Sequence, residues 1–289
     1  MHSKDAGPAK GTLYVVATPI GNLRDLSFRA LDVLAAVEVV AAEDTRVTAR
    51  LLSHYNLSKR LVALHEHNER RATETVVGFL EAGKSVALVS DAGTPAISDP
   101  GAQLVAEARR RGYPVVPVPG ANAALCALSA AGVGGGPFLF YGFLPSRPKA
   151  RREALTALRE LNFPIVFYEA PHRIVDSVRA IGETLGESRR ITLAKELTKV
   201  HEAFVEGAPQ DIVAWLETDP ARQRGEFVII VHARAPGDEL AATFDATSLL
   251  AALIDELPAS RAAAVVAKLT GADRQALFTQ ATAMKRARK

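Results

Sequence analysis

The chain has 289 residues, of which 48% are hydrophobic and 23% are charged, a composition typical of a folded globular protein with room for two domains. Its single cysteine, Cys126, excludes an intramolecular disulfide framework, and the surrounding Ala/Leu run favours a small core residue. No apolar run reaches the ~18 residues of a membrane span. The first ten residues are polar and lack the apolar segment of a signal peptide. We therefore expect a cytoplasmic protein without a membrane partner, and residues 1–10 as a disordered tail.

Positive charge is concentrated in two places. The net charge is +3, and residues 240–289 alone carry seven Lys and Arg against four Asp and Glu, which also gives +3. A second cluster consists of Arg147, Lys149, Arg151 and Arg152. Clustered positive charge favours a polyanionic partner such as nucleic acid more than the total charge does. A solvated tail and a solvated helix start are the alternative interpretations.

Apolar runs alternate with amphipathic segments over residues 11–132. The expected strands are Thr12–Ala17, Val37–Ala41, Leu61–Leu64, the run that begins at Val86, and Val115–Val118. The expected helices are Arg24–Ala36, a helix from Asp44 or Thr45 to Leu52, Arg71–Ala82, a helix after Gly101, and a helix from Asn122 to Ala131. This order predicts an α/β domain with a mostly parallel sheet covered on both faces. No G-x-G-x-x-G follows the first strand, so the dinucleotide-binding fingerprint is absent.

The stretch from Val86 to Gly101 is the most informative part of this domain. Its apolar run ends in a loop of small and polar residues that contains two prolines and two glycines, before a helical pattern begins. Open α/β sheets bind ligands at the carboxyl ends of their strands, and glycine allows a close approach of the backbone. The stretch therefore predicts a ligand site, and an ordinary strand-to-helix turn is the alternative.

Three further polar loops follow strands of the same predicted sheet, at residues 42–46, 65–70 and 119–124. Asp44 and Asn122 are also suited to cap the helices that follow them. His65 and His67 flank a single residue, which is not the i, i+4 spacing of a helical zinc site, and no third ligand is evident. We expect no metal here. Residues 65–70 either form a polar contact patch or only stabilise the start of the following helix, and the sequence is compatible with both.

The second half of the chain is richer in strands. A Gly-rich linker at residues 133–137 leads into residues 137–236, a second predicted α/β domain. Its expected strands are Phe138–Phe143, Pro164–Tyr168, Ile191–Ala194, Ala203–Glu206 and Phe227–Val231, and its expected helices are Lys149–Leu161, Pro171–Leu185 and Pro209–Glu217. The short strand Ala203–Glu206 is expected to pair in a hairpin. Residues 243–289 predict three short helices, which are compatible with a basic helix-turn-helix and equally with a packing appendage.

Eight motifs resemble one known family in their order and spacing. They are Leu13–Leu23, Ala41–Arg46, His65–Glu69, Val86–Gly101, Pro119–Gly120, Tyr141–Pro145, Phe167–Glu169 with His172–Arg173, and Glu196–Lys199. Together they resemble the tetrapyrrole-methylase superfamily and, within it, the family of ribosomal RNA small-subunit methyltransferase I. The resemblance extends from Gly11 over nearly the whole chain.

The resemblance implies an S-adenosylmethionine-dependent enzyme with two α/β domains, the cofactor in the cleft between them, and a helix-turn-helix-like C-terminal extension. The implied reaction is 2′-O-methylation of a cytidine ribose in the decoding region of 16S ribosomal RNA, within the small ribosomal subunit. Members of the family are homodimers. A methylase of a small tetrapyrrole and a non-catalytic RNA-binding protein of the same fold remain alternatives.

The resemblance also suggests site residues. Cofactor contacts are expected at Pro19, Gly21, Thr94, Ala96, Ile97, Asn122, Ala123, Phe167 and Tyr168. A protonated ribose hydroxyl is a poor nucleophile, so we expect a general base, with Glu169 and Glu66 as the first candidates. RNA phosphates are expected to contact Arg46, Arg147, Lys149, Arg151, Arg152, Arg173 and Lys199. Capping or ion pairing is the alternative explanation for these charged residues.

Overall fold

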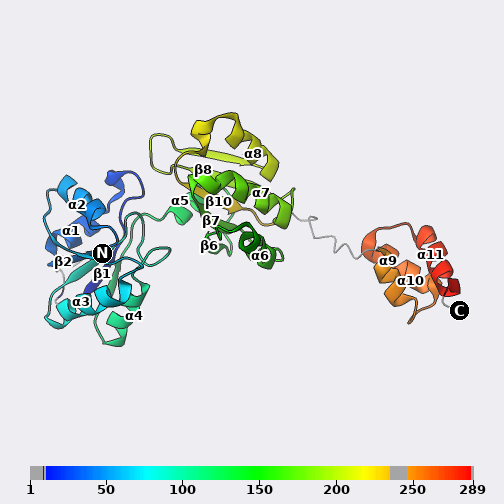
Figure 1. Cartoon of the computed structure of the whole chain (residues 1–289), viewed down its shortest axis with the longest axis horizontal. Coiled ribbons are helices and arrows are strands. Elements are labelled where there is room, and N and C mark those ends of the chain that lie inside the picture. Colours follow the sequence, from blue (N-terminus) through cyan, green and yellow to red (C-terminus); the bar gives the residue numbers. More distant parts are fainter. Residues whose placement is uncertain (1–8, 10, 235–245, 288–289) are drawn as a thin grey trace. The chain divides into compact units, whose positions relative to one another are not determined.

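The computed structural model describes residue 9, residues 11–234 and residues 246–287 (Figure 1). The chain divides into two compact units, Met1–Ala233 and Arg234–Lys289. Both α/β halves that the sequence predicts as separate domains lie in the first unit. The predicted tail, residues 1–10, lies outside the described residues except for Ala9. In the described part of the chain, no helix combines the length and the apolar character needed to cross a bilayer.

The first sheet is parallel throughout and has the strand order β3-β2-β4-β1-β5. Its strands are β1 (Leu13–Val16), β2 (Val39–Ala42), β3 (Arg60–Ala63), β4 (Val86–Val89) and β5 (Val115–Val118). Apolar residues of α1 (Phe28–Ala36) and α2 (Thr45–His54) pack on one face, and those of α3 (Glu69–Glu81) and α4 (Ala102–Arg110) pack on the other. The predicted parallel sheet with helices on both faces is confirmed.

The second sheet is mixed and has the order β6-β7-β10-β8-β9. Its strands are β6 (Leu139–Phe143), β7 (Ile165–Glu169), β8 (Ile191–Lys195), β9 (Ala203–Gly207) and β10 (Phe227–Val231). Only β6 and β7 run parallel to each other, and the predicted hairpin is confirmed as the antiparallel pair β8–β9. Residues of α6 (Pro148–Leu158), α7 (Ile174–Leu185) and α8 (Pro209–Thr218) form the core on one face of this sheet.

Helix α5 (Ala123–Ala130) joins the two halves. It follows the last strand of the first sheet, yet it packs on the free face of the second sheet. Ala124 and Ala127 are buried there against Val166 and Val228, because alanine lets a helix approach a sheet closely. Cys126 is half-buried at the edge of this contact, so the prediction of a core position is only partly met.

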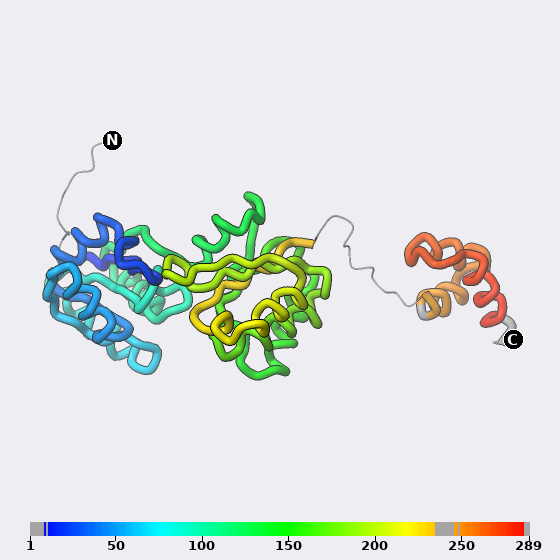
Figure 2. Tube along the Cα trace, turned by 90° about the horizontal axis from the view of Figure 1, so that it is seen from above, coloured from blue at the N-terminus to red at the C-terminus, as the bar shows by residue number. Residues whose placement is uncertain are grey.

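A second contact joins the halves at the β8–β9 connection. Figure 2 shows this connection, in yellow-green, reaching the blue N-terminal segment. A Cβ added to Gly21 would lie 2.5 Å from Cγ of Lys199 and 2.9 Å from Oγ1 of Thr198. Ile20 and Leu197 belong to the same buried cluster as α5. The loop after β1 therefore packs directly on the second half of the unit.

Two predicted helices begin later than expected. The segment predicted as one helix from Arg24 is a 3-10 turn, Leu23–Asp25, followed by α1. Ser27 separates them, because its Oγ accepts a hydrogen bond from the Ala30 N–H at 3.1 Å and so caps α1. In the same way, the helix predicted from Pro171 begins with a 3-10 turn, Pro171–Arg173, before α7.

The second unit consists of three helices, α9 (Ala246–Leu253), α10 (Ala259–Thr270) and α11 (Arg274–Ala287). They share a small core that includes Leu250, Ile254, Val266 and Leu277. Gly271 ends α10 in the left-handed region at φ +70°, which favours glycine. The three predicted helices are confirmed, and Asp245, Arg288 and Lys289 of the predicted charge cluster lie outside the described residues.

We predict that Gly101→Ala lowers the free energy of unfolding of the first unit by about 1–3 kcal/mol. Gly101 has φ +125°, and an added Cβ would meet Cδ2 of Leu88 at 2.7 Å. The control is Gly78→Ala in α3, where nothing lies within 4 Å, and it should be neutral or stabilise by up to about 1 kcal/mol. Denaturant titration followed by circular dichroism measures both, and equal midpoints for the two variants would contradict the argument.

Candidate active site

A cavity of about 370 Å³ opens where the strand ends of the first sheet face the second sheet. Because parallel strands end at the same edge of a sheet, the loops after β1, β2, β4 and β5 converge there. The lining residues from the first half are Ile20, Glu43, Asp91, Ala92, Gly93, Thr94, Ile97, Ser98, Asp99, Asn122 and Ala123. Those from the second half are Phe143, Tyr168, Glu169, Ala170, Pro171, Leu197, Glu226, Phe227 and Val228. Its size is in the range of pockets that hold small organic ligands.

Backbone hydrogen bonds hold the floor of the cavity together. Thr18 and Gly93, from the loops after β1 and β4, exchange a pair of N–H···O bonds of 2.8 and 3.0 Å. The Thr18 hydroxyl donates a further bond to the Ser90 carbonyl at 3.1 Å. Gly93 has φ +84°, which suits glycine at this point. These bonds fix the two loops without using any side chain that faces the cavity.

The loop after β4 is also tied to its neighbours. Thr94 donates a hydrogen bond from its hydroxyl to the Ala121 carbonyl at 3.0 Å, which joins this loop to the loop after β5. Glu69 of α3 accepts bonds from the N–H groups of Gly101 and Gln103 at 2.8 and 3.1 Å, at the start of α4. Ala96 lies between these points at φ +64°, an unusual value for a residue with a Cβ. Such strain is typical of functional loops.

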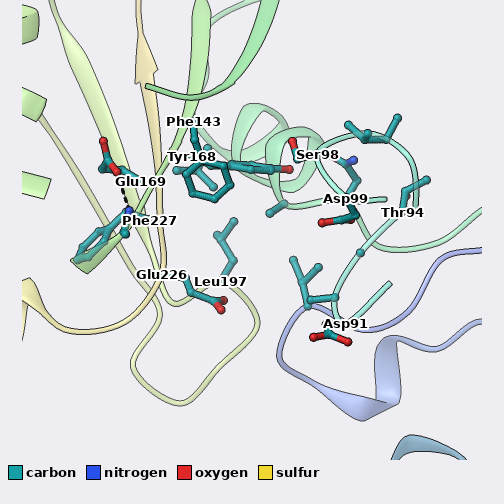
Figure 3. Close-up of a pocket in the computed structure, with 18 of the residues that line it drawn as sticks. Asp91, Thr94, Ser98, Asp99, Phe143, Tyr168, Glu169, Leu197, Glu226 and Phe227 are labelled. Carbon is teal, nitrogen blue, oxygen red and sulfur yellow. Dashed lines mark hydrogen bonds between the residues drawn. The ribbon is translucent and has the colours of Figure 1, made fainter. Parts of the chain in front are cut away.

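One wall of the cavity is acidic. Asp91 accepts a hydrogen bond from the Asp44 N–H at 3.0 Å, and Glu43 accepts one from the Asp91 N–H at 3.3 Å. Burial raises the pKa of Asp99, and the charge of Asp91 adds to this effect, while a hydrogen bond with Ser90 opposes it. Burial is also the main reason why the pKa of Glu43 is raised, with the charges of Asp99 and Asp91 contributing. Figure 3 shows Asp91 and Asp99 on the same side of the cavity.

The opposite wall is aromatic. The Tyr168 hydroxyl accepts a hydrogen bond from the Ala124 N–H at 3.2 Å, so α5 fixes the ring. Phe140 and Phe143 contact this ring edge-to-face, with centroid distances of 5.0 and 5.6 Å. Burial raises the pKa of the Tyr168 phenol, which keeps it protonated at neutral pH. This wall can accept a flat apolar group, whereas the acidic wall can accept a cation.

Five of the nine residues predicted to hold a cofactor line the cavity: Thr94, Ile97, Asn122, Ala123 and Tyr168. Pro19, Gly21 and Ala96 belong to the loops around it but do not line it. Phe167 does not reach it, because its side chain is fully buried in the core under α6, α7 and α8. The alternation of β7 explains the difference, since neighbouring residues on a strand point to opposite faces.

The two predicted general bases are not placed alike. Glu66 is exposed and does not line the cavity. Glu169 borders the cavity, but its side chain is fully buried and its carboxylate is already bound. It accepts hydrogen bonds from the Ala170 N–H at 2.8 Å, from the Ser177 hydroxyl and from Arg173. These contacts favour a structural role for the Glu169 carboxylate over the expected role of general base.

Three of the residues predicted to bind RNA are exposed at the start of α6: Arg147, Lys149 and Arg152. Arg151 of the same cluster is 5% exposed and points inward, where its Nη1 lies 3.5 Å from the Ser177 hydroxyl. A contact of Arg151 with phosphate is therefore not supported. Three others are engaged in ion pairs, namely Arg46 with Asp44, Arg173 with Glu169, and Lys199 with Glu196 and Glu226.

Sequence reasoning missed several cavity residues. Asp91, Ser98 and Asp99 lie in the Val86–Gly101 stretch that predicts the site, and Phe143 lies in the Tyr141–Pro145 motif. The signal that could have found the first three is their position after a buried strand. Leu197 lies in the Glu196–Lys199 motif on the β8–β9 connection, whereas Glu226 and Phe227, at the start of β10, lie in none of the motifs.

We predict that Glu169→Gln lowers the free energy of unfolding by about 3 kcal/mol, because it leaves the part-buried Arg173 without its carboxylate. The matched control is Glu217→Gln, which removes an ion pair with Arg179 of α7 in which both side chains are about half exposed. That change should cost less than about 1 kcal/mol. Chemical denaturation measures both, and equal costs would refute the structural role of Glu169.

Comparison with known proteins identifies the family to which this fold and cavity belong. The model of the tetrapyrrole (corrin/porphyrin) methylases matches residues 12–213, and that of the RsmI C-terminal HTH domain matches residues 241–285. The chain is 48% identical to ribosomal RNA small subunit methyltransferase I of Escherichia coli O157:H7, over 96% of this chain and 97% of that protein. It is 46% identical to the protein of the same name from Pseudomonas aeruginosa, over 94% of this chain and 96% of that protein.

Solved structures share the fold at low sequence identity. The cobalt precorrin-4 methyltransferase CbiF has a TM-score of 0.58 at 17% identity, covering 76% of this chain and 95% of that one. Uroporphyrin-III C-methyltransferase from Thermus thermophilus, solved with S-adenosylhomocysteine, has a TM-score of 0.54 at 19% identity, covering 76% and 97%. The predicted fold class is therefore confirmed. The chain belongs to the tetrapyrrole methylase family and, within it, to the family of ribosomal RNA small subunit methyltransferase I.

Proposed function

We propose that this chain is an S-adenosylmethionine-dependent methyltransferase that methylates the 2′-hydroxyl of a cytidine ribose in the decoding region of 16S ribosomal RNA. The observation that carries the proposal is the cavity between acidic and aromatic walls, in a chain 48% identical to an enzyme named for methylating small-subunit ribosomal RNA. An assembled small subunit as substrate, a cytoplasmic location and a homodimer complete the proposal, and they rest on the family resemblance.

The cavity residues fit S-adenosylmethionine. The cofactor carries a sulfonium and an ammonium, which Asp91 and Glu43 complement in charge. Its adenine is flat with apolar faces, which suits the lining residues Ile97, Leu197 and Tyr168. When bound, the cofactor supplies an electrophilic methyl group, so the protein needs neither a covalent intermediate nor a metal of its own. A related methyltransferase of this fold was solved with S-adenosylhomocysteine.

The work left to the protein is to align the reactants, exclude water and accept a proton. We assign the last role to Asp99. It lines the cavity and is only partly exposed. Glu169 is occupied by Arg173 and Ser177, and Glu66 lies elsewhere. A carboxylate with a raised pKa is a better proton acceptor than an ordinary one.

Two groups of exposed cations, one in each unit, are suited to the RNA backbone. Arg147, Lys149 and Arg152 follow β6, the strand that brings Phe143 to the cavity. In the second unit, Arg261, Lys268 and Arg274 are exposed on α10 and α11, and the family of the matching domain is named for a helix-turn-helix. Lys and Arg bind phosphates independently of sequence, so both groups would add affinity rather than choose the nucleotide.

A methylase of a small tetrapyrrole is the second candidate, since the structural neighbours named above act on precorrin-4 and uroporphyrin III. Those neighbours cover about three quarters of this chain, whereas the ribosomal RNA methyltransferase relatives cover nearly all of it. The C-terminal domain match also favours RNA.

Deleting the gene tests the function directly. Methylation of 16S ribosomal RNA is mapped by mass spectrometry in the deletion strain and in strains complemented with the wild type or with Asp99→Asn. We expect one 2′-O-methylcytidine of the decoding region to disappear in the deletion strain and to return only with the wild type. An unchanged methylation map would reject the proposed function.

We predict that Asp99→Asn lowers the single-turnover rate on small subunits roughly a hundredfold, because the proton acceptor is lost. Calorimetry with S-adenosylmethionine provides the control, since the cofactor should still bind.

In the wild type the rate should fall as the pH decreases through the raised pKa of Asp99. Asp91→Asn removes a charge that raises this pKa, so the acid limb of the profile should move to lower pH. A full rate for Asp99→Asn, or a limb that moves to higher pH in Asp91→Asn, would contradict the assignment.

A further inference from the structure

Phe143 is an aromatic side chain at the cavity whose ring contacts Tyr168 and still leaves about half of its surface exposed. Its exposed fraction is 54%, although it lines the cavity and large apolar side chains normally avoid water. The other aromatic residues of the lining are covered, since Tyr168 is part-buried and Phe227 is 2% exposed. A ring held at the cavity with half of its surface open is suited to contact a ligand rather than the core.

A β-bulge places Phe143 at the cavity. In the pairing of β6 with β7, Phe140 lies opposite Val166 and Gly142 lies opposite Phe167, so Tyr141 is an extra residue. Gly142 has φ +82°. Without the extra residue, positions 140 and 143 would point to opposite faces of the sheet. The bulge brings Phe143 opposite Tyr168, on the same face as Phe140.

The surroundings of Phe143 indicate the kind of ligand. Its ring contacts the Tyr168 ring edge-to-face, and α5 fixes Tyr168 through its hydroxyl, so Phe143 rests on a rigid support (Figure 3). Four residues further along the chain begins the exposed cationic group Arg147, Lys149 and Arg152. An aromatic ring followed closely in the chain by cations that can hold phosphates is a combination suited to bind unpaired bases of nucleic acids.

We propose that Phe143 is the platform on which the base of the target nucleotide stacks while its ribose enters the cavity. This inference rests on the proposed function. The base and the 2′-hydroxyl are attached to neighbouring carbons of the ribose, so a hydroxyl that reaches the cavity carries its base to the cavity wall. A base within a helical stack cannot do this, and the nucleotide must be extruded or already unpaired. Stacking on Phe143 offsets part of the cost of unstacking and orients the ribose.

A double-mutant cycle tests the contact. Full-length wild type and Phe143→Leu, each saturated with S-adenosylhomocysteine, bind two fluorescent single-stranded RNAs that span the methylated nucleotide. One RNA is intact and the other lacks the base of that nucleotide. We expect the wild type to bind the abasic RNA roughly tenfold more weakly than the intact RNA, and Phe143→Leu to bind both RNAs equally weakly. Phe143→Tyr should restore the discrimination.

Phe28→Leu is the matched control, since Phe28 is 90% exposed on α1 and does not line the cavity. It should behave as the wild type does. Discrimination that survives in Phe143→Leu, or a wild type that does not discriminate, would overturn the inference. So would a change of oligomeric mass in Phe143→Leu, which would assign the ring to a contact between copies. If the methylation map confirms the modification while the cycle shows no coupling, only this inference fails.

Discussion

The packing of α5 on the second sheet is the contact on which the site depends. The helix belongs by sequence to the first sheet, and its buried Ala124 and Ala127 contact Val166 and Val228 of the other. Its N-terminus places Asn122 and Ala123 at the cavity, and the Ala124 N–H holds the Tyr168 hydroxyl. One small-residue surface therefore fixes the distance between the acidic and the aromatic wall. A larger side chain at either alanine would separate the walls as well as disturb the core.

One face of the second sheet contributes side chains to the cavity, and the other face packs on the helices of the core. Tyr168 points toward the cavity, whereas its neighbours Phe167 and Glu169 point toward α7. On that side Glu169 joins β7 to Arg173 and Ser177, next to the Ala170–Pro171 rim of the cavity. A carboxylate can thus border a site and yet serve the fold. A buried carboxylate needs partners that satisfy its charge, and the partners of Glu169 hold the rim of the cavity in place.

Local sequence predicts most of the fold and less of the site. The parallel sheet follows from apolar runs such as Val86–Val89, and Asp44 and Asn122 cap helices as their residue types predict. Whether Arg151 or Glu169 faces water depends on packing against α7, which no local pattern contains. Phe143 could not be placed because a single extra residue in β6 reverses the face on which it lies. The first sheet could be predicted well because most of its strands end in a local signal, whereas Glu226 and Phe227 reach the cavity at the start of β10, outside any such signal.

The exchange of main-chain bonds between Thr18 and Gly93 has an evolutionary consequence. The cavity floor is closed by main-chain atoms that every residue except proline possesses, so mutation can replace most side chains around it, Gly93 at φ +84° apart, without opening it. The fold itself is shared with a precorrin-4 methyltransferase at 17% identity. New acceptors for the methyl group, from macrocycles to polynucleotides, then require changes only in the walls and in appended units.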